Sequence, residues 1–99
     1  MFTHCVFFWL KEGMTADEKA VFERKLRALI DIPSVLFGSV GTPAATDRSV
    51  VDRSYTWGLT VAFEDLAGHD AYQVDETHLD FRDTCSKFFQ KVVVYDFEG

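Results

Sequence analysis

The chain has only two cysteines and two prolines in 99 residues, and it lacks any long apolar run. Cys5 and Cys85 have neither CxxC spacing nor the density of a disulfide-stabilised domain, which favours free thiols and a cytoplasmic location over a disulfide. The longest uninterrupted apolar segment, residues 5–10, is far shorter than the roughly 20 residues that span a bilayer. No Lys or Arg precedes it, so we expect neither a membrane span nor a signal peptide.

Basic residues are also few, with 10 Lys and Arg against 16 Asp and Glu and a formal net charge of -6. Because the bases form no patch, we expect no nucleic acid and no anionic membrane as partner. The three histidines show no HxxxH spacing and have no cysteine nearby in the pattern of a zinc site, so the sequence predicts no metal site and no cofactor. The acidic residues between positions 64 and 83 are more typical of a solvated helix face than of a cation site.

Apolar residues, in contrast, are abundant: 47% of the chain is hydrophobic and ten residues are Phe. The length allows one domain, which we expect to cover residues 1–99. A core of this size is thin, so the high apolar content favours additional burial in an oligomer.

Hydrophobic patterning predicts a strand at residues 2–10, whose two faces alternate and are both largely apolar. Thr15 and Glu18 form a capping-box pattern that starts a helix, which ends near Ile30 because Pro33 follows. A short strand at 35–40 and a loop at 41–53 precede the strand at 54–63, where Tyr55 and Trp57 are expected on the helix-facing side.

Asp65 is a second helix-capping candidate, for a helix running through residues 71 and 72. Residues 75–77, from Asp75 to Thr77, interrupt the helical pattern and offer new capping oxygens for the next helix. A last helix to about Phe89 and a Val-rich strand at 91–97 complete the chain. The order β-α-β-β-α-β predicts an α+β fold, a ferredoxin-like sandwich with helices on one face of an antiparallel sheet. The other face would be bare, so we expect a homodimer whose sheets face each other and form a dimeric α/β barrel.

Several short motifs together resemble the stress-responsive dimeric alpha/beta barrel family over nearly the whole chain. They are His4-x-Val6-x-Phe8, Leu29-x-x-Ile32-Pro33, Val40-Gly41-x-Pro43, Tyr55-Thr-Trp-Gly58, Tyr72 with His78-x-x-Phe81, and Val94-Tyr-Asp-Phe97. The chain departs from the family at Asp75-Glu76, where members often have His-Pro. Most of the family is of unknown activity.

One enzymatic member, plant olivetolic acid cyclase, closes a linear polyketide by aldol condensation in a site between sheet and helices. The resemblance places its first-strand histidine on His4, its tyrosine on Tyr72 and its catalytic histidine on His78. Where the cyclase has a third-strand histidine, this chain has Trp57, which neither accepts nor relays a proton and would narrow the pocket. The resemblance therefore implies related chemistry on a smaller, aromatic compound.

Each candidate residue also has a purely structural interpretation. His78 near a helix start could make a structural hydrogen bond, and neighbouring acids leave its protonation state open. Tyr72 and His4 could be core residues with satisfied polar atoms, and Cys85 is expected to serve packing. His69 is expected to be a solvated helix residue.

Three functions follow as hypotheses. In the first, a dimer binds a small ligand in a cleft, with His78 as base, Tyr72 holding an oxyanion and His4 orienting either. That cleft would be lined by His4, Phe8, Phe22, Trp57, Leu59, Tyr72 and His78. The second is a non-enzymatic stress or assembly protein, and the third is a cofactor-less oxygenase that uses Trp57 and His78 around a phenol.

Overall fold

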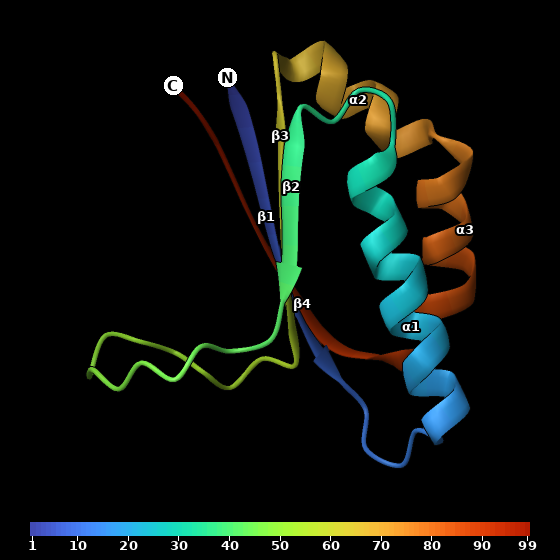
Figure 1. The fold of residues 1–99 in the computed structure, drawn as a ribbon, viewed down its shortest axis with the longest axis vertical. Coiled ribbons are helices and arrows are strands. Elements are labelled where there is room, and N and C mark those ends of the chain that lie inside the picture. The colour runs from blue at the N-terminus through green and yellow to red at the C-terminus, as the bar shows by residue number, and fades with distance from the viewer.

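The computed structural model describes all 99 residues and forms a four-stranded antiparallel sheet with helices on one side (Figure 1). The elements are β1 (Phe2–Leu10), α1 (Ala16–Ala28), β2 (Phe37–Gly41), β3 (Trp57–Phe63), α2 (Leu66–Val74), α3 (Glu76–Cys85) and β4 (Phe89–Glu98). One-turn 3-10 helices, Leu29–Asp31 and Ser86–Phe88, follow α1 and α3. The strand order β2-β3-β1-β4 confirms the predicted ferredoxin-like α+β fold, with its second helix divided in two.

The predicted capping residues start the helices. The Thr15 hydroxyl accepts a hydrogen bond from the Glu18 amide at 3.1 Å, and the Glu18 carboxylate accepts one from the Thr15 amide at 2.9 Å. The Asp65 carboxylate caps α2, and the Asp75 carboxylate caps α3 by accepting from the amide of Thr77. Asp75 therefore ends one helix and starts the next, which sets the angle between α2 and α3.

Several element boundaries differ from the prediction. β2 covers Phe37–Gly41 instead of residues 35–40, β3 begins at Trp57 instead of residue 54, and β4 begins at residue 89 instead of 91. α3 itself ends at Cys85, and the 3-10 turn Ser86–Phe88 extends the helical segment close to the predicted end near Phe89. The Thr56 hydroxyl accepts a hydrogen bond from the Leu10 amide at 3.1 Å, so the chain before β3 does not continue the strand. Tyr55 consequently lies on the face opposite to the predicted one.

Alternation along β1 divides the molecule into a buried and an open side. His4, Val6 and Phe8 point into the layer between sheet and helices and are buried, whereas the residues between them are partly exposed. Phe22 and Leu26 of α1 fill that layer and have no exposed surface. The core thus lies between the sheet and its single layer of helices, as expected for this fold.

The opposite face of the sheet is apolar and uncovered in the single chain. Phe7 contacts the rings of Tyr55 and Tyr95 there, with ring centroids 5.0 and 6.4 Å apart. Tyr95 and Phe97 are 63% and 59% exposed. The chain exposes 6244 Å², against about 5,700 Å² expected for a compact monomer of its mass.

Residues 42–56 form an arm that leaves the sheet on the side away from the helices (Figure 1). The Trp9 indole donates to the Ser54 hydroxyl at 2.9 Å and ties the returning end of the arm to β1. The two chain ends lie together, because the N-terminal ammonium donates to the Gly99 carbonyl at 2.8 Å. None of the helices has the length and apolar character needed to cross a membrane.

Candidate functional site

The break between α2 and α3 brings Tyr72 and His78 together. Tyr72 lies in the last turn of α2 and His78 in the first turn of α3, on either side of Asp75. Their ring centroids are 4.7 Å apart, and both side chains are buried, with 1% and 8% of their surface exposed. The two candidate residues of the helical layer therefore form one pair.

The surroundings of His78 favour the neutral imidazole. Burial lowers the pKa of His78 below its ordinary value, and the positive charge of Arg82 on the next turn of α3 lowers the pKa further. The backbone of Gln73 near the ring acts in the other direction on the pKa, but no hydrogen bond of normal geometry reaches the buried Nδ1 atom. A neutral imidazole with a free ring nitrogen can accept a proton near neutral pH.

Tyr72 offers the complementary group. Burial raises the pKa of its phenol well above the ordinary value, so the phenol stays protonated at every physiological pH. A protonated phenol donates a hydrogen bond, which is what a developing oxyanion needs.

His4 on β1 contacts Asp96 on β4, a residue that was not among the predicted site residues. Its Nδ1 lies 2.5 Å from Oδ1 of Asp96, which stands directly opposite it where β1 pairs with β4. Burial has the largest effect on the pKa of His4 and lowers it, although the Asp96 carboxylate acts in the other direction. Asp96 was detectable only by pairing the first strand with the last one in this register.

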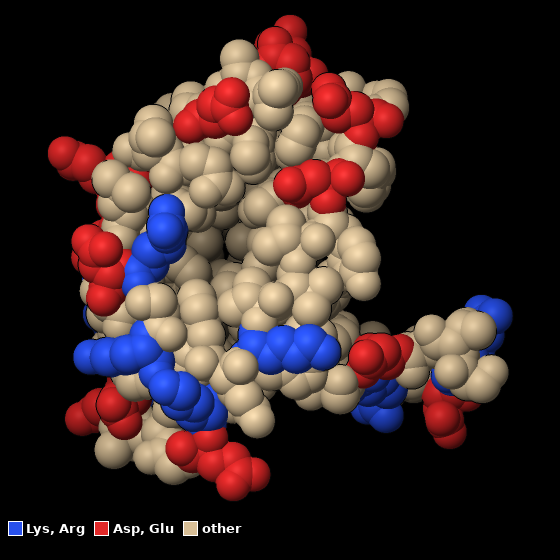
Figure 2. Space-filling view, turned by 180° about the vertical axis from the view of Figure 1, so that it is seen from behind, with Lys and Arg blue, Asp and Glu red and all other residues tan.

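A cavity of about 220 Å³ connects these groups. It lies between the sheet and the α2–α3 pair and is lined by five of the seven predicted residues, namely His4, Phe8, Leu59, Tyr72 and His78. Arg82 contributes the one charged side chain to its wall. The surface viewed from behind Figure 1 is hollowed between the helical layer and the sheet, and the rim of the hollow consists mostly of uncharged side chains with basic side chains beside it (Figure 2).

The other two predicted lining residues lie elsewhere, which corrects the expectation of one shared cleft. Trp57 pairs with Phe8 on β1, whereas His4 pairs with Val61, four residues farther along β3. At about 3.3 Å per residue, Trp57 stands roughly 13 Å along the strand from the level of His4. Phe22 is fully enclosed, because its ring packs against those of Phe8 and Phe81, and it lines no cavity.

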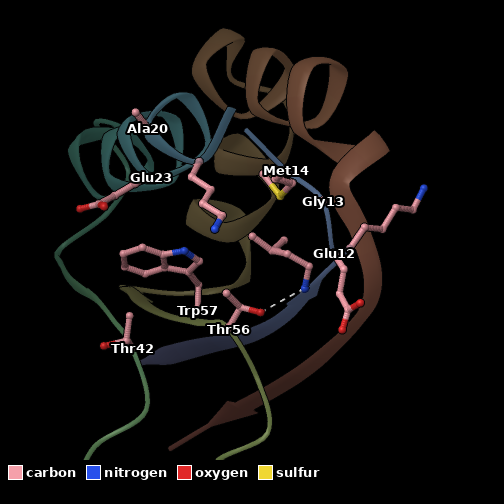
Figure 3. A pocket seen from close by; sticks show the side chains of 11 residues that line it. Glu12, Gly13, Met14, Ala20, Glu23, Thr42, Thr56 and Trp57 are labelled. Carbon is pink, nitrogen blue, oxygen red and sulfur yellow. Dashed lines mark hydrogen bonds between the residues drawn. The ribbon is translucent and has the colours of Figure 1, made fainter. Parts of the chain in front are cut away.

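Trp57 instead lines a larger cavity, of about 750 Å³, between the start of α1, the end of β1 and the start of β3 (Figure 3). Its polar lining consists of Lys, Glu and Thr side chains such as Lys19, Glu23 and Thr42. It contains no histidine and no tyrosine. Proton transfer near neutral pH is therefore better served by the smaller cavity, where His78 and Tyr72 meet.

His69 is not the solvated residue that the sequence predicted. Only 15% of its side chain is exposed, and its ring packs against those of Phe2 and His4, with centroids 4.7 and 5.2 Å away. His69 and Tyr72 are three residues apart on α2, so both lie on the helix face that covers β1. No short-range motif could have revealed this contact. The thiols of Cys5 and Cys85 are free, as expected.

Comparison with known proteins identifies relatives of the whole chain. The model of the stress responsive A/B barrel domain matches residues 2–99. No curated protein sequence matches the chain significantly. A dimeric ferredoxin-like protein of unknown function from Thermobifida fusca is similar in structure, with a TM-score of 0.79, 18% identity, and coverage of 99% of this chain and 90% of that chain.

Two further structures with the same fold have named activities. A hydroxynitrile lyase from Passiflora edulis has a TM-score of 0.77 and 19% identity, over 97% of this chain and 90% of that chain. A putative antibiotic biosynthesis monooxygenase from Nitrosomonas europaea has a TM-score of 0.72 and 16% identity, over 100% of this chain and 98% of that chain. At these identities the similarity establishes the fold.

Proposed function

The chain belongs to the stress responsive A/B barrel domain family, and we propose that it is a homodimer that binds a small aromatic carbonyl compound and transfers a proton on it. The observation that carries this proposal is the buried pair of His78 and Tyr72 in one cavity. One member of the pair has a free ring nitrogen and a lowered pKa, and the other remains a protonated donor.

The proposed step is the removal of a proton from the carbon next to a carbonyl group. His78 Nδ1 takes the proton, and the C–H electron pair moves to form an enolate whose oxygen carries the negative charge. The Tyr72 phenol donates a hydrogen bond to that oxygen, and the positive charge of Arg82 faces the same cavity. His78 then returns the proton to carbon. Alternatively, the enolate carbon attacks a second carbonyl, a C–C bond forms as the C=O π bond breaks, and His78 gives the proton to the resulting alkoxide.

The size of the cavity limits the ligand. A cavity of about 220 Å³ is below the usual range for drug-sized ligands, and an apolar cavity of roughly 150 Å³ already accommodates benzene. Phe8 and Leu59 provide an apolar wall for one ring. We therefore expect single-ring compounds with short side chains to bind better than long polyketides.

The uncovered face of the sheet supports the homodimer in this proposal. Tyr95 and Phe97 form part of an exposed apolar face that a second copy would cover, and solved structures with this fold are described as dimeric. The Passiflora edulis neighbour, named a hydroxynitrile lyase, agrees with catalysis by this fold. The oxygenase hypothesis needs Trp57 beside His78, but the two residues line different cavities.

The proposal is tested by following hydrogen-deuterium exchange at the α-carbon of small aryl ketones in D₂O by NMR. The wild-type protein is expected to accelerate exchange, and His78→Gln is expected to lose about 100-fold or more of that acceleration. Tyr72→Phe should lose a smaller part. Trp57→Phe is the matched control, because it changes an aromatic residue of the other cavity, and should keep the wild-type rate.

A second measurement separates binding from catalysis. Ligands that occupy the cavity of the folded protein should raise its melting temperature by mass action. A melting-temperature shift without accelerated exchange would indicate a binding protein. If neither effect occurs with any single-ring ketone, aldehyde or phenol, the proposal is wrong and a non-enzymatic assembly role takes its place.

A further inference from the structure

Three residues that are remote in sequence meet at the end of the sheet that α2 covers. They are His4 on β1, His69 on α2 and Asp96 on β4, and one nitrogen or carboxylate oxygen from each lies within 4.8 Å of the others. The side chain of His4 is 6% exposed, that of His69 is 15% exposed, and that of Asp96 is 39% exposed. The cluster is therefore closed toward the core and open on one side toward solvent.

We propose that His4, His69 and Asp96 bind a divalent transition-metal ion, and that Zn²⁺ is the ion they suit best. Two imidazoles and one carboxylate are a donor set that zinc uses with a fourth position left to water. With metal–ligand bonds of about 2.0–2.2 Å, tetrahedral ligands lie roughly 3.3 Å apart. Atoms at the 4.8 Å limit must therefore approach each other by about 1.5 Å, and the contact of 2.5 Å between His4 and Asp96 must lengthen by about 0.8 Å. The partly exposed Asp96 allows this by turning its carboxylate.

Contacts around His69 fit an orienting role. Its Nδ1 lies 3.2 Å from the Asp70 carboxylate, the type of outer contact that sets the tautomer and orientation of a metal-binding histidine. This leaves Nε2 for the ion. Gln73 has its amide nitrogen 3.2 Å from Nε2, and the ion would replace that contact.

The alternative is that the cluster is only a hydrogen-bonded network. The contact of 2.5 Å between His4 and Asp96 already satisfies one nitrogen and one oxygen without an ion. That contact does not involve His69, however, which offers one ring nitrogen to the same place from another element. The two alternatives therefore differ in what the loss of His69 does.

The test uses the purified full-length protein, stripped with a chelator and titrated with Co²⁺ and with Zn²⁺. Tetrahedral Co²⁺ gives an intense visible absorption that reports the coordination geometry, and calorimetry gives the Zn²⁺ stoichiometry and Kd. We expect one ion per chain, a Co²⁺ spectrum that Zn²⁺ displaces, and a melting temperature that rises with the ion and falls again on chelation. The substitutions His69→Ala and Asp96→Asn should each raise the Kd by more than about 10-fold.

His78→Gln is the matched control, because His78 is the remaining histidine of the chain and lies outside the cluster. It should keep the wild-type Kd, stoichiometry and Co²⁺ spectrum. Asp96→Asn preserves the size of the side chain, and ion-free melting curves establish that each variant is folded. Equal Kd values for wild type and His69→Ala, or a Co²⁺ spectrum typical of octahedral coordination, would overturn the proposal. The proton-exchange assay, run with chelator present, tests the proposed function independently of the ion.

Discussion

At the scale of single residues, His78 is distinguished by a buried ring nitrogen that forms no hydrogen bond. A buried polar atom normally has a hydrogen-bond partner, and leaving one without a partner costs about 1–3 kcal/mol. His78 Nδ1 is such an atom, whereas His4 Nδ1 is paired with Asp96. The two buried histidines of this core therefore differ: one is fixed by the fold, and the other retains an unused nitrogen.

This difference predicts opposite effects of the same substitution. His78→Gln should change the free energy of unfolding by less than about 1 kcal/mol, because no hydrogen-bond partner of Nδ1 is left behind. His4→Gln removes the buried ring that contacts the Asp96 carboxylate, so it should lower the free energy of unfolding by about 1–3 kcal/mol. Urea denaturation measures both. Equal losses for the two variants would mean that His78 also serves as a structural residue.

The lowered pKa values of His4 and His78 predict a stability that depends on pH. Both histidines have an ordinary pKa near 6.5 in the unfolded chain and a lower pKa in the folded one. Below about pH 6.5 the unfolded state therefore binds more protons, and the protein loses stability as the pH falls from 7.5 toward 5. Melting curves across this range test the sign, and His78→Gln should show a smaller loss than wild type. A melting temperature that rises on acidification would contradict the pKa directions.

At the scale of elements, the packing of β2 against the chain after α1 depends on a glycine. Gly38 faces the helical side, where a Cβ atom would lie 2.7 Å from Cγ2 of Ile30 and 3.0 Å from the Thr60 carbonyl oxygen. The same strand ends at Gly41, where a Cβ atom would meet nothing within 4 Å. The close approach of β2 to the 3-10 turn after α1 thus depends on one missing side chain.

Gly38→Ala should consequently destabilise the protein by about 1–3 kcal/mol through overpacking. Gly41→Ala is the matched control on the same strand and should be neutral or slightly stabilising, because alanine restricts the unfolded chain. Adding Ile30→Ala to Gly38→Ala should cost less than the sum of the two single changes. Additive losses would place the strain at the Thr60 carbonyl instead of at Ile30.

At the scale of the whole molecule, the sheet is covered on one face only. The extents of 37 × 34 × 17 Å describe a thin two-layer body, and the arm of residues 42–56 projects beyond the uncovered face (Figure 1). Large exposed apolar areas of this kind mark interaction sites. A second copy placed sheet to sheet would cover Tyr95 and Phe97 and would lie beside the arm.

Light scattering at micromolar concentration should therefore give about twice the mass of 11.3 kDa. Tyr95→Asp should yield folded monomers, because Tyr95 is 63% exposed in the single chain and the charge is costly only when a partner buries it. Leu66→Asp is the control, since Leu66 is 51% exposed at the start of α2, within the helical layer. A soluble wild-type monomer would contradict the dimeric barrel.

The sequence by itself determined the order of the elements, the helix starts at Thr15, Asp65 and Asp75, and the buried face of β1. These features depend on residues within a few positions of one another, so period and capping chemistry suffice to predict them. The family resemblance added His4, Tyr72 and His78, which the structure does bring to one cavity.

Only the tertiary structure decided which residues share a level along the sheet. Alternation predicts the face on which Trp57 lies but not which neighbours it has there. Phe8 stands opposite Trp57 and lines the cavity of His4, whereas Trp57 lines another cavity. Similarly, Asp96 meets His4 across 92 positions through strand register, and His69 becomes partly buried because α2 crosses the end of β1. Contacts of this kind depend on how whole elements pack, and no pattern within a short stretch of sequence records them.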